Sequence, residues 1–159
     1  MEFFTIGVYN SSETDFFQKL VTNNIDTFCD IRQRRGVRGS KYAFVNSKRL
    51  QAKLDELDIK YGHIKDLAPP KEIRELQKKA DLETGQKKRQ RDEMGEIFKT
   101  EYIQRILNNF DFELFFENLE NIGAKKVVLF CVEEKPKACH RSLVTTRLAD
   151  EFNFEVTHI

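Results

Sequence analysis

The sequence has little of what marks a secreted, membrane-spanning or nucleic-acid-coating chain. Its 159 residues include three cysteines, three prolines, seven glycines and no tryptophan, and the formal net charge at pH 7 is +1. An odd cysteine count without a secretory signal argues against a disulfide framework. The longest apolar runs, such as residues 127–132, are far shorter than the roughly 20 residues of a membrane span. We expect a cytoplasmic protein with no membrane partner, and any attraction to nucleic acid must come from local clusters of charge.

Apolar, β-rich segments alternate with segments of helical periodicity along the chain. Strands are expected at residues 3–8, 25–31, 59–64, 126–132 and 154–159. Helices are expected after the Ser12 capping box, after Asn46, across residues 112–119 and across residues 139–152. Five strands alternating with helices predict an α/β fold of three layers, with a mostly parallel five-stranded sheet and helices on both faces.

One polar segment interrupts this alternation. Residues 71–101 follow Pro69-Pro70 and have helical propensity but few apolar anchors. We expect them to form a polar helical insertion, in pieces, within a single domain that spans residues 1–159. The nearest approach to a charge run lies inside this insertion and is interpreted as a solvated helix face. It consists of Lys87, Lys88, Arg89 and Arg91.

A cationic loop follows the second expected strand, which ends at Asp30. No acidic residue occurs from Ile31 through Leu54, although the whole chain is nearly neutral. The loop cations are Arg32, Arg34, Arg35, Arg38 and Lys41. Guanidinium groups fork onto phosphate oxygens, so the loop predicts an anion site, and Tyr42 and Phe44 beside it are available to stack on a base. The alternative is a solvated loop in which Asp30 pairs with one arginine.

A second candidate site follows the fourth expected strand. Cys131 ends this strand, and Cys139-His140-Arg141 stands at the start of the last helix. The unpaired N–H groups and dipole of a helix N-terminus favour a thiolate or a bound anion, and Arg141 would add to that field. His140 is suited to act as an acid or base near neutral pH. The alternative is that Cys131 is a buried structural residue and Cys139 has no special reactivity.

Two further histidines also end expected strands. His63 could share a face with Asp30, or it could be an interior histidine that is bonded to a backbone carbonyl. His158 lies next to Ile159 at the end of the last strand. Cys131, Cys139, His140 and His158 lack the close Cys-x-x-Cys or His-x-x-x-His spacings of metal ligands, so no metal site is predicted.

Several motif-based functions lack support. The chain has no Walker loop and no Gly-x-Gly-x-x-Gly string, so no particular cofactor is indicated and neither ATP nor dinucleotide use has a motif. Rhodanese and phosphatase loops need an arginine six residues after the cysteine. Here Lys137 and Thr145 stand six residues after Cys131 and Cys139, which argues against a sulfur-transfer domain.

These strings, taken in order, resemble the domain of unknown function 488 family. Where the family shows Thr-Ile-Gly-His-Ser, this sequence has Thr5-Ile6-Gly7-Val8-Tyr9, which lacks the polar pair. The family's Asp-Val-Arg and Tyr-x-His correspond to Asp30-Ile31-Arg32 and Tyr61-Gly62-His63. Its clearest signature, Cys-x-Glu, a proline and then Cys-His-Arg, is matched by Cys131, Glu133, Pro136 and Cys139-His140-Arg141. His158-Ile159 matches the closing His-Ile.

The resemblance spans nearly the whole chain and implies a compact α/β fold with a polar pocket, but no established activity. Our first hypothesis is an enzyme-like domain that binds a phosphate-bearing ligand, a nucleotide or nucleic acid, at the carboxyl ends of the strands. Cys139 or His140 would act as nucleophile or acid/base, oriented by Asp30. The expected ligand-binding residues are Arg32, Arg141, His63, Cys131, Glu133, Tyr61 and Lys41. The alternative is a non-catalytic nucleic-acid-binding module that uses the basic loop 32–49.

Overall fold

The computed structural model describes residues 1–85 and 92–159 and contains a sheet of five strands. The strands are β1 (Glu2–Ile6), β2 (Thr27–Asp30), β3 (Lys60–His63), β4 (Lys126–Phe130) and β5 (Val156–His158). Their order across the sheet is β3-β2-β4-β1-β5, and every neighbouring pair is parallel. The predicted α/β fold is therefore confirmed, and the sheet is entirely parallel. The strands are shorter than the apolar runs, because the last residues of several runs form the loops at the carboxyl edge.

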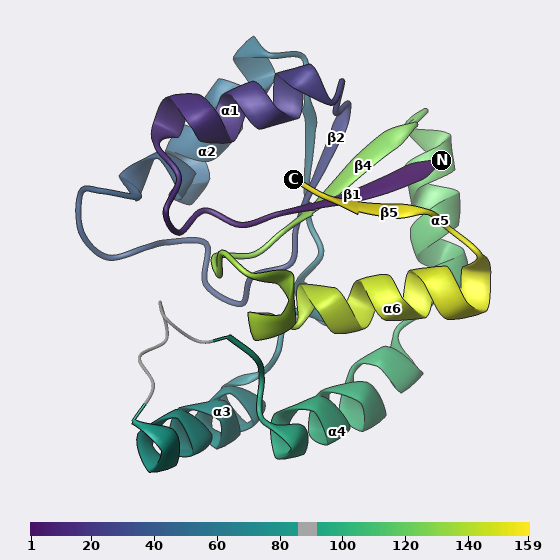
Figure 1. The fold of residues 1–159 in the computed structure, drawn as a ribbon. Helices are drawn as coiled ribbons and strands as arrows, with labels where there is room; N and C mark the ends of the chain where they lie inside the picture. Colours follow the sequence, from purple (N-terminus) through teal and green to yellow (C-terminus); the bar gives the residue numbers. More distant parts are fainter. Residues whose placement is uncertain (86–91) are drawn as a thin grey trace.

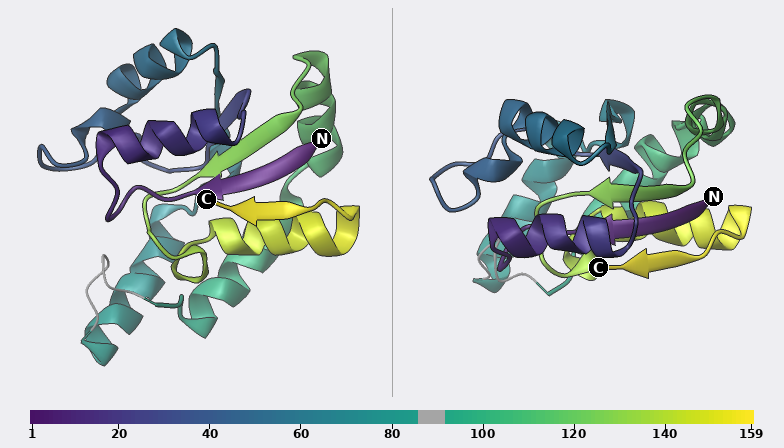
Figure 2. Two further views of the ribbon diagram at one scale, coloured as in Figure 1. Left: turned by 45° about the horizontal axis from the view of Figure 1, so that its top comes forward. Right: turned by 90° about the horizontal axis from the view of Figure 1, so that it is seen from above.

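Helices cover both faces of this sheet (Figures 1 and 2). α1 (Glu13–Thr22) and α2 (Ser47–Glu56) lie on one face, and α5 (Phe112–Asn121) and α6 (Arg141–Phe152) lie on the other. The strand order explains this division. The first two crossovers run in one direction across the sheet and the later ones run back, and right-handed crossovers in opposite directions place their helices on opposite faces.

Phenylalanines fill the space on both sides of the sheet. Phe28 of β2 and Phe130 of β4 pack on Phe16 of α1, whereas Phe3 of β1 packs on Phe115 and on further rings of the opposite face. A strand that is covered on both faces needs apolar residues at successive positions rather than at alternate ones. This requirement accounts for the unbroken apolar sequence of β4.

The polar segment forms two helices, α3 (Lys71–Thr84) and α4 (Glu96–Arg105), which Figure 1 shows on the α6 side of the sheet. Ile73, Phe98 and Tyr102 are buried and anchor the pair. The hydroxyl of Tyr102 donates a hydrogen bond of 2.5 Å to the carbonyl of Leu67, which ties α4 to the loop after β3. The basic cluster at residues 87–91 lies outside the described residues.

Short 3₁₀ helices complete the described chain, and two of them contribute to the carboxyl edge of the sheet. They are η1 (Ala43–Val45), η2 (Lys65–Leu67), η4 (Leu107–Asn109) and η5 (Pro136–Ala138). In the part of the chain that the structure describes, no helix combines the length and apolar character that a bilayer crossing requires.

Candidate functional site

A cavity of about 570 Å³ lies where the loops after β1, β2 and β4 meet the first turns of α3. This volume is typical of small-molecule sites, and the carboxyl edge of a parallel sheet is where such sites form. Among the described residues of its wall, six are Lys or Arg and three are Asp or Glu. The cationic members are Arg32, Arg34, Arg38, Lys71, Arg74 and Lys78. The wall therefore carries an excess of positive charge in a chain that is nearly neutral overall.

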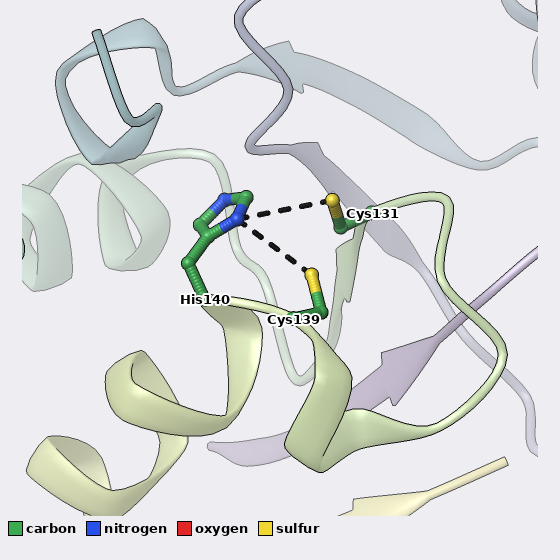
Figure 3. Close-up of side chains that lie close together, drawn as sticks. All are labelled: Cys131, Cys139 and His140. Atoms are coloured by element: carbon green, nitrogen blue, oxygen red, sulfur yellow. Dashed lines mark hydrogen bonds between the residues drawn. The ribbon is translucent and has the colours of Figure 1, made fainter. Parts of the chain in front are cut away.

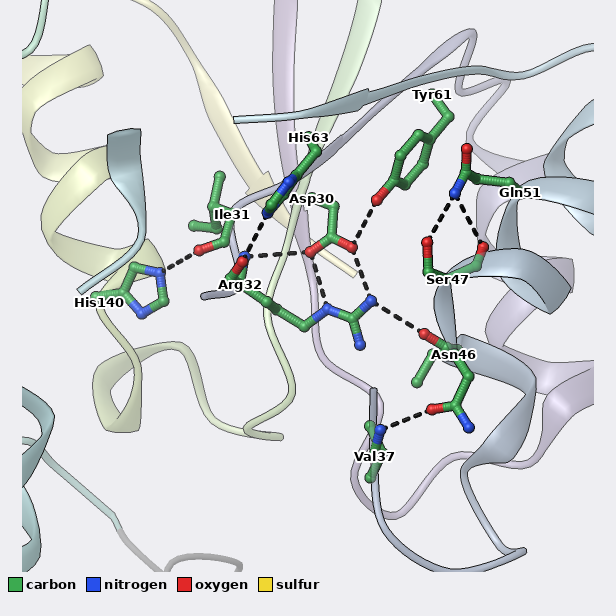
Figure 4. A network of polar contacts seen from close by, with 11 residues as sticks. Asp30, Ile31, Arg32, Val37, Asn46, Ser47, Gln51, Tyr61, His63 and His140 are labelled. Atoms are coloured by element: carbon green, nitrogen blue, oxygen red, sulfur yellow. Dashed lines mark hydrogen bonds and ion pairs between the residues drawn. The ribbon is translucent and has the colours of Figure 1, made fainter. Parts of the chain in front are cut away.

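Arg32 enters this wall as one half of a buried ion pair with Asp30 (Figure 4). Its Nε and Nη2 donate to the two carboxylate oxygens of Asp30 at 2.8 and 2.7 Å, and Nη2 also donates to the carbonyl of Val45 at 3.0 Å. The guanidinium lies over the ring of Phe130, 4.5 Å from its centroid. Nη1 is buried and has no hydrogen-bond partner among the described residues. Asp30 thus holds the guanidinium of Arg32 in an orientation that leaves Nη1 without a hydrogen-bond partner among the described residues.

Tyr61 completes this network from β3. Its hydroxyl donates to Asp30 at 3.0 Å. Burial, followed by the negative charge of Asp30, raises the pKa of Tyr61 to about 12. Asp30 therefore bonds Arg32 and Tyr61. The expected contact, in which Asp30 would orient Cys139 or His140, is not formed between these described side chains.

His63 has a backbone partner. Its Nε2 lies 2.9 Å from the carbonyl oxygen of Arg32, and this oxygen can only accept, so Nε2 carries the proton. Of the two alternatives, the structure shows the histidine bonded to a carbonyl, although it still lies beside the Asp30 network. His63 supports the turn that carries Arg32 and is not one of the residues that line the cavity.

Cys131, Cys139 and His140 also line the cavity and meet at one point of its wall (Figure 3). Nδ1 of His140 lies 3.6 Å from the sulfur of Cys139 and 3.9 Å from the sulfur of Cys131. Nε2 of His140 lies 3.0 Å from the carbonyl oxygen of Ile31, and this acceptor requires a proton on Nε2. In the neutral imidazole, Nδ1 is therefore the unprotonated nitrogen, and it faces both sulfurs. A thiol, a base and a third group that orients the base are the parts of an activated nucleophile.

The electrostatics of this cluster keep Cys131 protonated. The hydrogen bond with Cys139, burial and the neighbouring negative groups raise the pKa of Cys131 well above its ordinary value. Its sulfur lies 3.4 Å from a carboxylate oxygen of Glu133 and donates to it. Burial lowers the pKa of His140, but Cys131, Glu133 and the carbonyl of Ile31 raise it by more, so the net shift is upward.

The last helix begins two residues later than the sequence predicts. α6 starts at Arg141, and Cys139 has an extended backbone before it, so the sulfur is not in the first helical turn. The prediction was wrong here because η5 already turns the chain, and the backbone N–H of Cys139 bonds the carbonyl of Pro136. The group placed to activate the thiol of Cys139 is therefore His140 rather than a helix terminus.

Arg141 holds the loop after β4 together. It is almost completely buried, and its Nη1 and Nη2 donate to the carbonyls of Glu133 and Glu134 at 2.5 and 2.7 Å. Gly7 permits this arrangement, because a Cβ at that position would overlap the Glu133 carbonyl and lie 3.1 Å from Nη2 of Arg141. Arg141 was expected to hold an anion. The structure places it behind the cavity wall, where it shapes the loop that carries Cys131 and Glu133.

The aromatic residues beside the basic loop face the core. Tyr42 and Phe44 are buried, so the expectation that they are available to stack on a base is wrong. They pack against each other and against Tyr9 and Phe16. Lys41 is exposed, and its ammonium lies 5.2 Å from the centre of the Tyr42 ring rather than in the cavity wall. This part of the loop therefore contributes packing, whereas Arg34 and Arg38 reach the cavity.

One protein-family model covers most of the chain. The family model described as "Domain of unknown function DUF488" matches residues 13–148. This chain belongs to that family. No curated protein matches the chain, and no solved structure matches it. The matched range contains the two walls of the cavity, apart from Tyr9.

The cationic face of α3 was missed by sequence analysis. Lys71, Arg74 and Lys78 all line the cavity, and the Nε of Arg74 is buried without a hydrogen-bond partner in the described chain. The sequence predicts residues 71–101 as a polar helical insertion and assigns none of them to the site. The spacing of these three cations, at i, i+3 and i+7, places them on one face of a helix and was the signal available in the sequence.

The four cysteine and histidine residues that the sequence analysis weighed as metal ligands, without predicting a site, are only partly brought together. Cys131, Cys139 and His140 lie within 4.8 Å of one another, whereas Nδ1 of His158 bonds the hydroxyl of Thr5 at 2.6 Å. The sequence offered no close ligand pair, and it is the fold that joins the end of β4 to the turn before α6. That convergence depends on the path of η5, which spacing alone does not reveal.

Proposed function

We propose that this domain binds a phosphate-bearing ligand, a nucleotide or a segment of nucleic acid, and presents it to the Cys139–His140 wall of the cavity. The supporting observation is that, of the three buried arginine nitrogens without a hydrogen-bond partner among the described residues, two belong to residues that line the cavity. These two are Nη1 of Arg32 and Nε of Arg74, whereas the third is Nε of Arg141. A buried donor without a partner costs about 1–3 kcal/mol. Phosphate oxygens would satisfy both donors.

The excess of positive charge in the cavity wall favours a ligand that carries more than one negative charge. Six cationic residues outnumber three acidic ones among the described lining residues. Arg32 is held rigidly by Asp30, so it loses little conformational freedom when a ligand binds. The thiol of Cys139 and the imidazole of His140 line the same cavity and supply groups that could react with the ligand. This supports an enzyme-like role rather than ligand binding alone.

The cysteines also bear on the cellular compartment of the protein. All three are free thiols in the structure, and Cys131 and Cys139 are close enough to share a hydrogen bond. A neighbouring pair of thiols persists in a reducing compartment. We therefore place the protein in the cytoplasm as part of this proposal.

Calorimetric titration of the EDTA-treated protein with pyrophosphate, a nucleoside triphosphate and a single-stranded oligonucleotide tests the proposal. At least one of these ligands should bind, and Arg74→Gln should weaken it by about 10- to 100-fold, which is the value of a charge-assisted hydrogen bond. Arg105→Gln is the matched control, because Arg105 is exposed, pairs with Glu101 and lies off the cavity. No binding of any of the three, or equal binding by Arg74→Gln and wild type, would overturn the proposal.

A second candidate function is a nucleic-acid-binding module without turnover. Arg34 and Arg38 are exposed at the rim of the cavity, in a loop that contains no acidic residue, and this arrangement favours contact with a phosphate backbone. A module of this kind binds the oligonucleotide with an affinity that falls steeply with salt, loses affinity in Arg38→Gln and is indifferent to Cys139→Ser. An enzyme loses turnover in Cys139→Ser while it still binds its ligand.

A further inference from the structure

Three soft ligand atoms are arranged on one wall of the cavity at the spacing of a metal site. The sulfurs of Cys131 and Cys139 and a ring nitrogen of His140 lie within 4.8 Å of one another, with Nδ1 at 3.6 and 3.9 Å from the sulfurs. Around a tetrahedral zinc ion, with Zn–S near 2.3 Å and Zn–N near 2.0–2.1 Å, a ligand sulfur and nitrogen are about 3.6 Å apart. We propose that Cys131, Cys139 and His140 bind a zinc ion.

The surroundings of His140 are those of a metal ligand. Metal-bound histidines usually donate their other ring N–H to a carbonyl or carboxylate, which fixes the tautomer and the direction of the ring. Nε2 of His140 donates to the carbonyl of Ile31 at 3.0 Å, and this leaves Nδ1 directed at both sulfurs (Figures 3 and 4). The ring of Tyr102, 5.4 Å away between centroids, packs against the imidazole. The ligand nitrogen is therefore positioned before any ion arrives.

The ligand types select the kind of ion. Thiolate and imidazole favour zinc and other borderline or soft metals, whereas magnesium and calcium prefer oxygen ligands. All three side chains are at most 5% exposed, so they bind the ion away from bulk water. The two sulfurs and Nδ1 already lie close enough together to bind a single ion without a large movement of the chain.

Two cysteines and one histidine leave the fourth tetrahedral position open. Structural zinc sites fill four positions with protein ligands, whereas catalytic sites keep one for water or substrate. All three ligand residues line the same cavity as Arg32 and Arg74. The open position would therefore accept a phosphoryl oxygen or a water beside the bound ligand, where the ion acts as a Lewis acid. This last step rests on the proposed function, but binding of the ion does not.

In the zinc-bound protein, the chemical roles on this wall change. Cys131 and Cys139 would then be thiolate ligands, so the sulfur of Cys139 would no longer serve as a nucleophile, and the ion would supply a Lewis acid. Glu133, whose carboxylate accepts from the thiol of Cys131 at 3.4 Å, lies beside the ligand set.

Titration of the reduced, metal-stripped full chain with cobalt(II) under argon tests the site. We expect one cobalt per chain, the intense visible bands of a tetrahedral ion and thiolate-to-cobalt charge transfer, all of which zinc then displaces. Cys139→Ala and His140→Ala should each weaken cobalt binding by at least tenfold, in line with the loss of a ligand. Cys29→Ala is the matched control, because Cys29 is equally buried but lies in β2, outside the cluster. Circular dichroism confirms that each variant is folded.

The wild-type spectrum is decisive even where a variant does not fold. A weak octahedral spectrum, binding without thiolate charge transfer, or equal loss of binding in Cys29→Ala and Cys139→Ala would overturn the inference. The pyrophosphate titration in EDTA is independent of the ion. Cobalt binding without anion binding therefore refutes the proposed function alone, and anion binding without cobalt binding refutes the metal site alone.

Discussion

The guanidinium of Arg32 binds the carboxylate of Asp30 through two hydrogen bonds, of 2.8 and 2.7 Å, where both side chains are almost fully buried. Removal of one partner from such a pair leaves an uncompensated charge in the interior. Asp30→Asn should therefore lower the free energy of unfolding by about 3–5 kcal/mol. Urea denaturation followed by circular dichroism measures this change.

The exposed ion pair between Arg49 and Glu13 provides the control for that measurement. Its side chains are 59% and 44% exposed, although its 2.8 Å distance is as short as that of the buried pair. Glu13→Gln should change the unfolding free energy by no more than about 1 kcal/mol. Equal effects of Asp30→Asn and Glu13→Gln would mean that Asp30 does not hold Arg32 in the folded protein.

The fold was predictable because its signals are local and repeated. β4, with the sequence Lys-Val-Val-Leu-Phe, is apolar at successive positions, and only a strand covered on both faces has that requirement. The capping box at Ser12 and Asp15 forms as expected, with the N–H of Asp15 bonded to the Ser12 hydroxyl at 3.0 Å. The strand order was not predicted, because the sequence of one strand does not determine which other strand it pairs with.

The site was harder to predict because it depends on directions rather than on residue types. Arg32 and Arg141 look equivalent in the sequence, yet one lines the cavity and the other bonds two carbonyls behind its wall. Arg74 was overlooked because the sequence does not reveal that Ile73 is buried in the core, which brings Arg74 beside it into the cavity wall. The charged side chains can be identified from the sequence. Which of them lie on the same cavity wall depends on how the crossover connections place the helices and loops.

Gly7 is required by a close approach of two loops. A Cβ there would overlap the carbonyl oxygen of Glu133, which is backbone and cannot rotate away. Gly7→Ala should therefore destabilise the protein by about 1–3 kcal/mol or more, the usual cost of overpacking. Gly62→Ala is the control, because its Cβ would make only an ordinary contact of 3.6 Å with Ile64. The two midpoints of urea unfolding should differ clearly, and a Gly7→Ala midpoint equal to that of Gly62→Ala would contradict the close approach.

Tyr61 should titrate far above an ordinary tyrosine. Burial first and the charge of Asp30 second raise its pKa from 10.0 to about 12. The folded protein therefore holds the Tyr61 proton more tightly than the unfolded chain does. The stability that results is complete below pH 10.0 and is lost as the pH rises toward 12.

The difference in ultraviolet absorbance between wild type and Tyr61→Phe isolates this titration. Its midpoint should be about 12 and should fall in Asp30→Asn, although burial still keeps it above 10.0. Tyr61→Phe should also make the unfolding free energy less sensitive to pH in this window. A midpoint near 10.0 in the wild type would show that Tyr61 does not bond Asp30.

The three cysteines should differ in their access to small reagents. Cys139 lines the cavity, whereas Cys29 lies inside β2 and its pKa is raised to about 12 by burial and then by the charge of Asp30. A thiol reacts as its thiolate, so Cys29 should be modified at least tenfold more slowly than Cys139 by methyl methanethiosulfonate. Peptide mass spectrometry at successive times measures both rates.

Denaturant and ligand provide the two controls for this labelling. In urea the rates for Cys29 and Cys139 should converge, because the unfolded chain exposes both thiols equally. Pyrophosphate should slow the modification of Cys139 and leave Cys29 unchanged, since the cavity joins the cationic wall to the cluster. If Cys29 reacts as fast as Cys139 in the folded protein, or if a bound anion has no effect on Cys139, the sulfur does not share a cavity with Arg32 and Arg74.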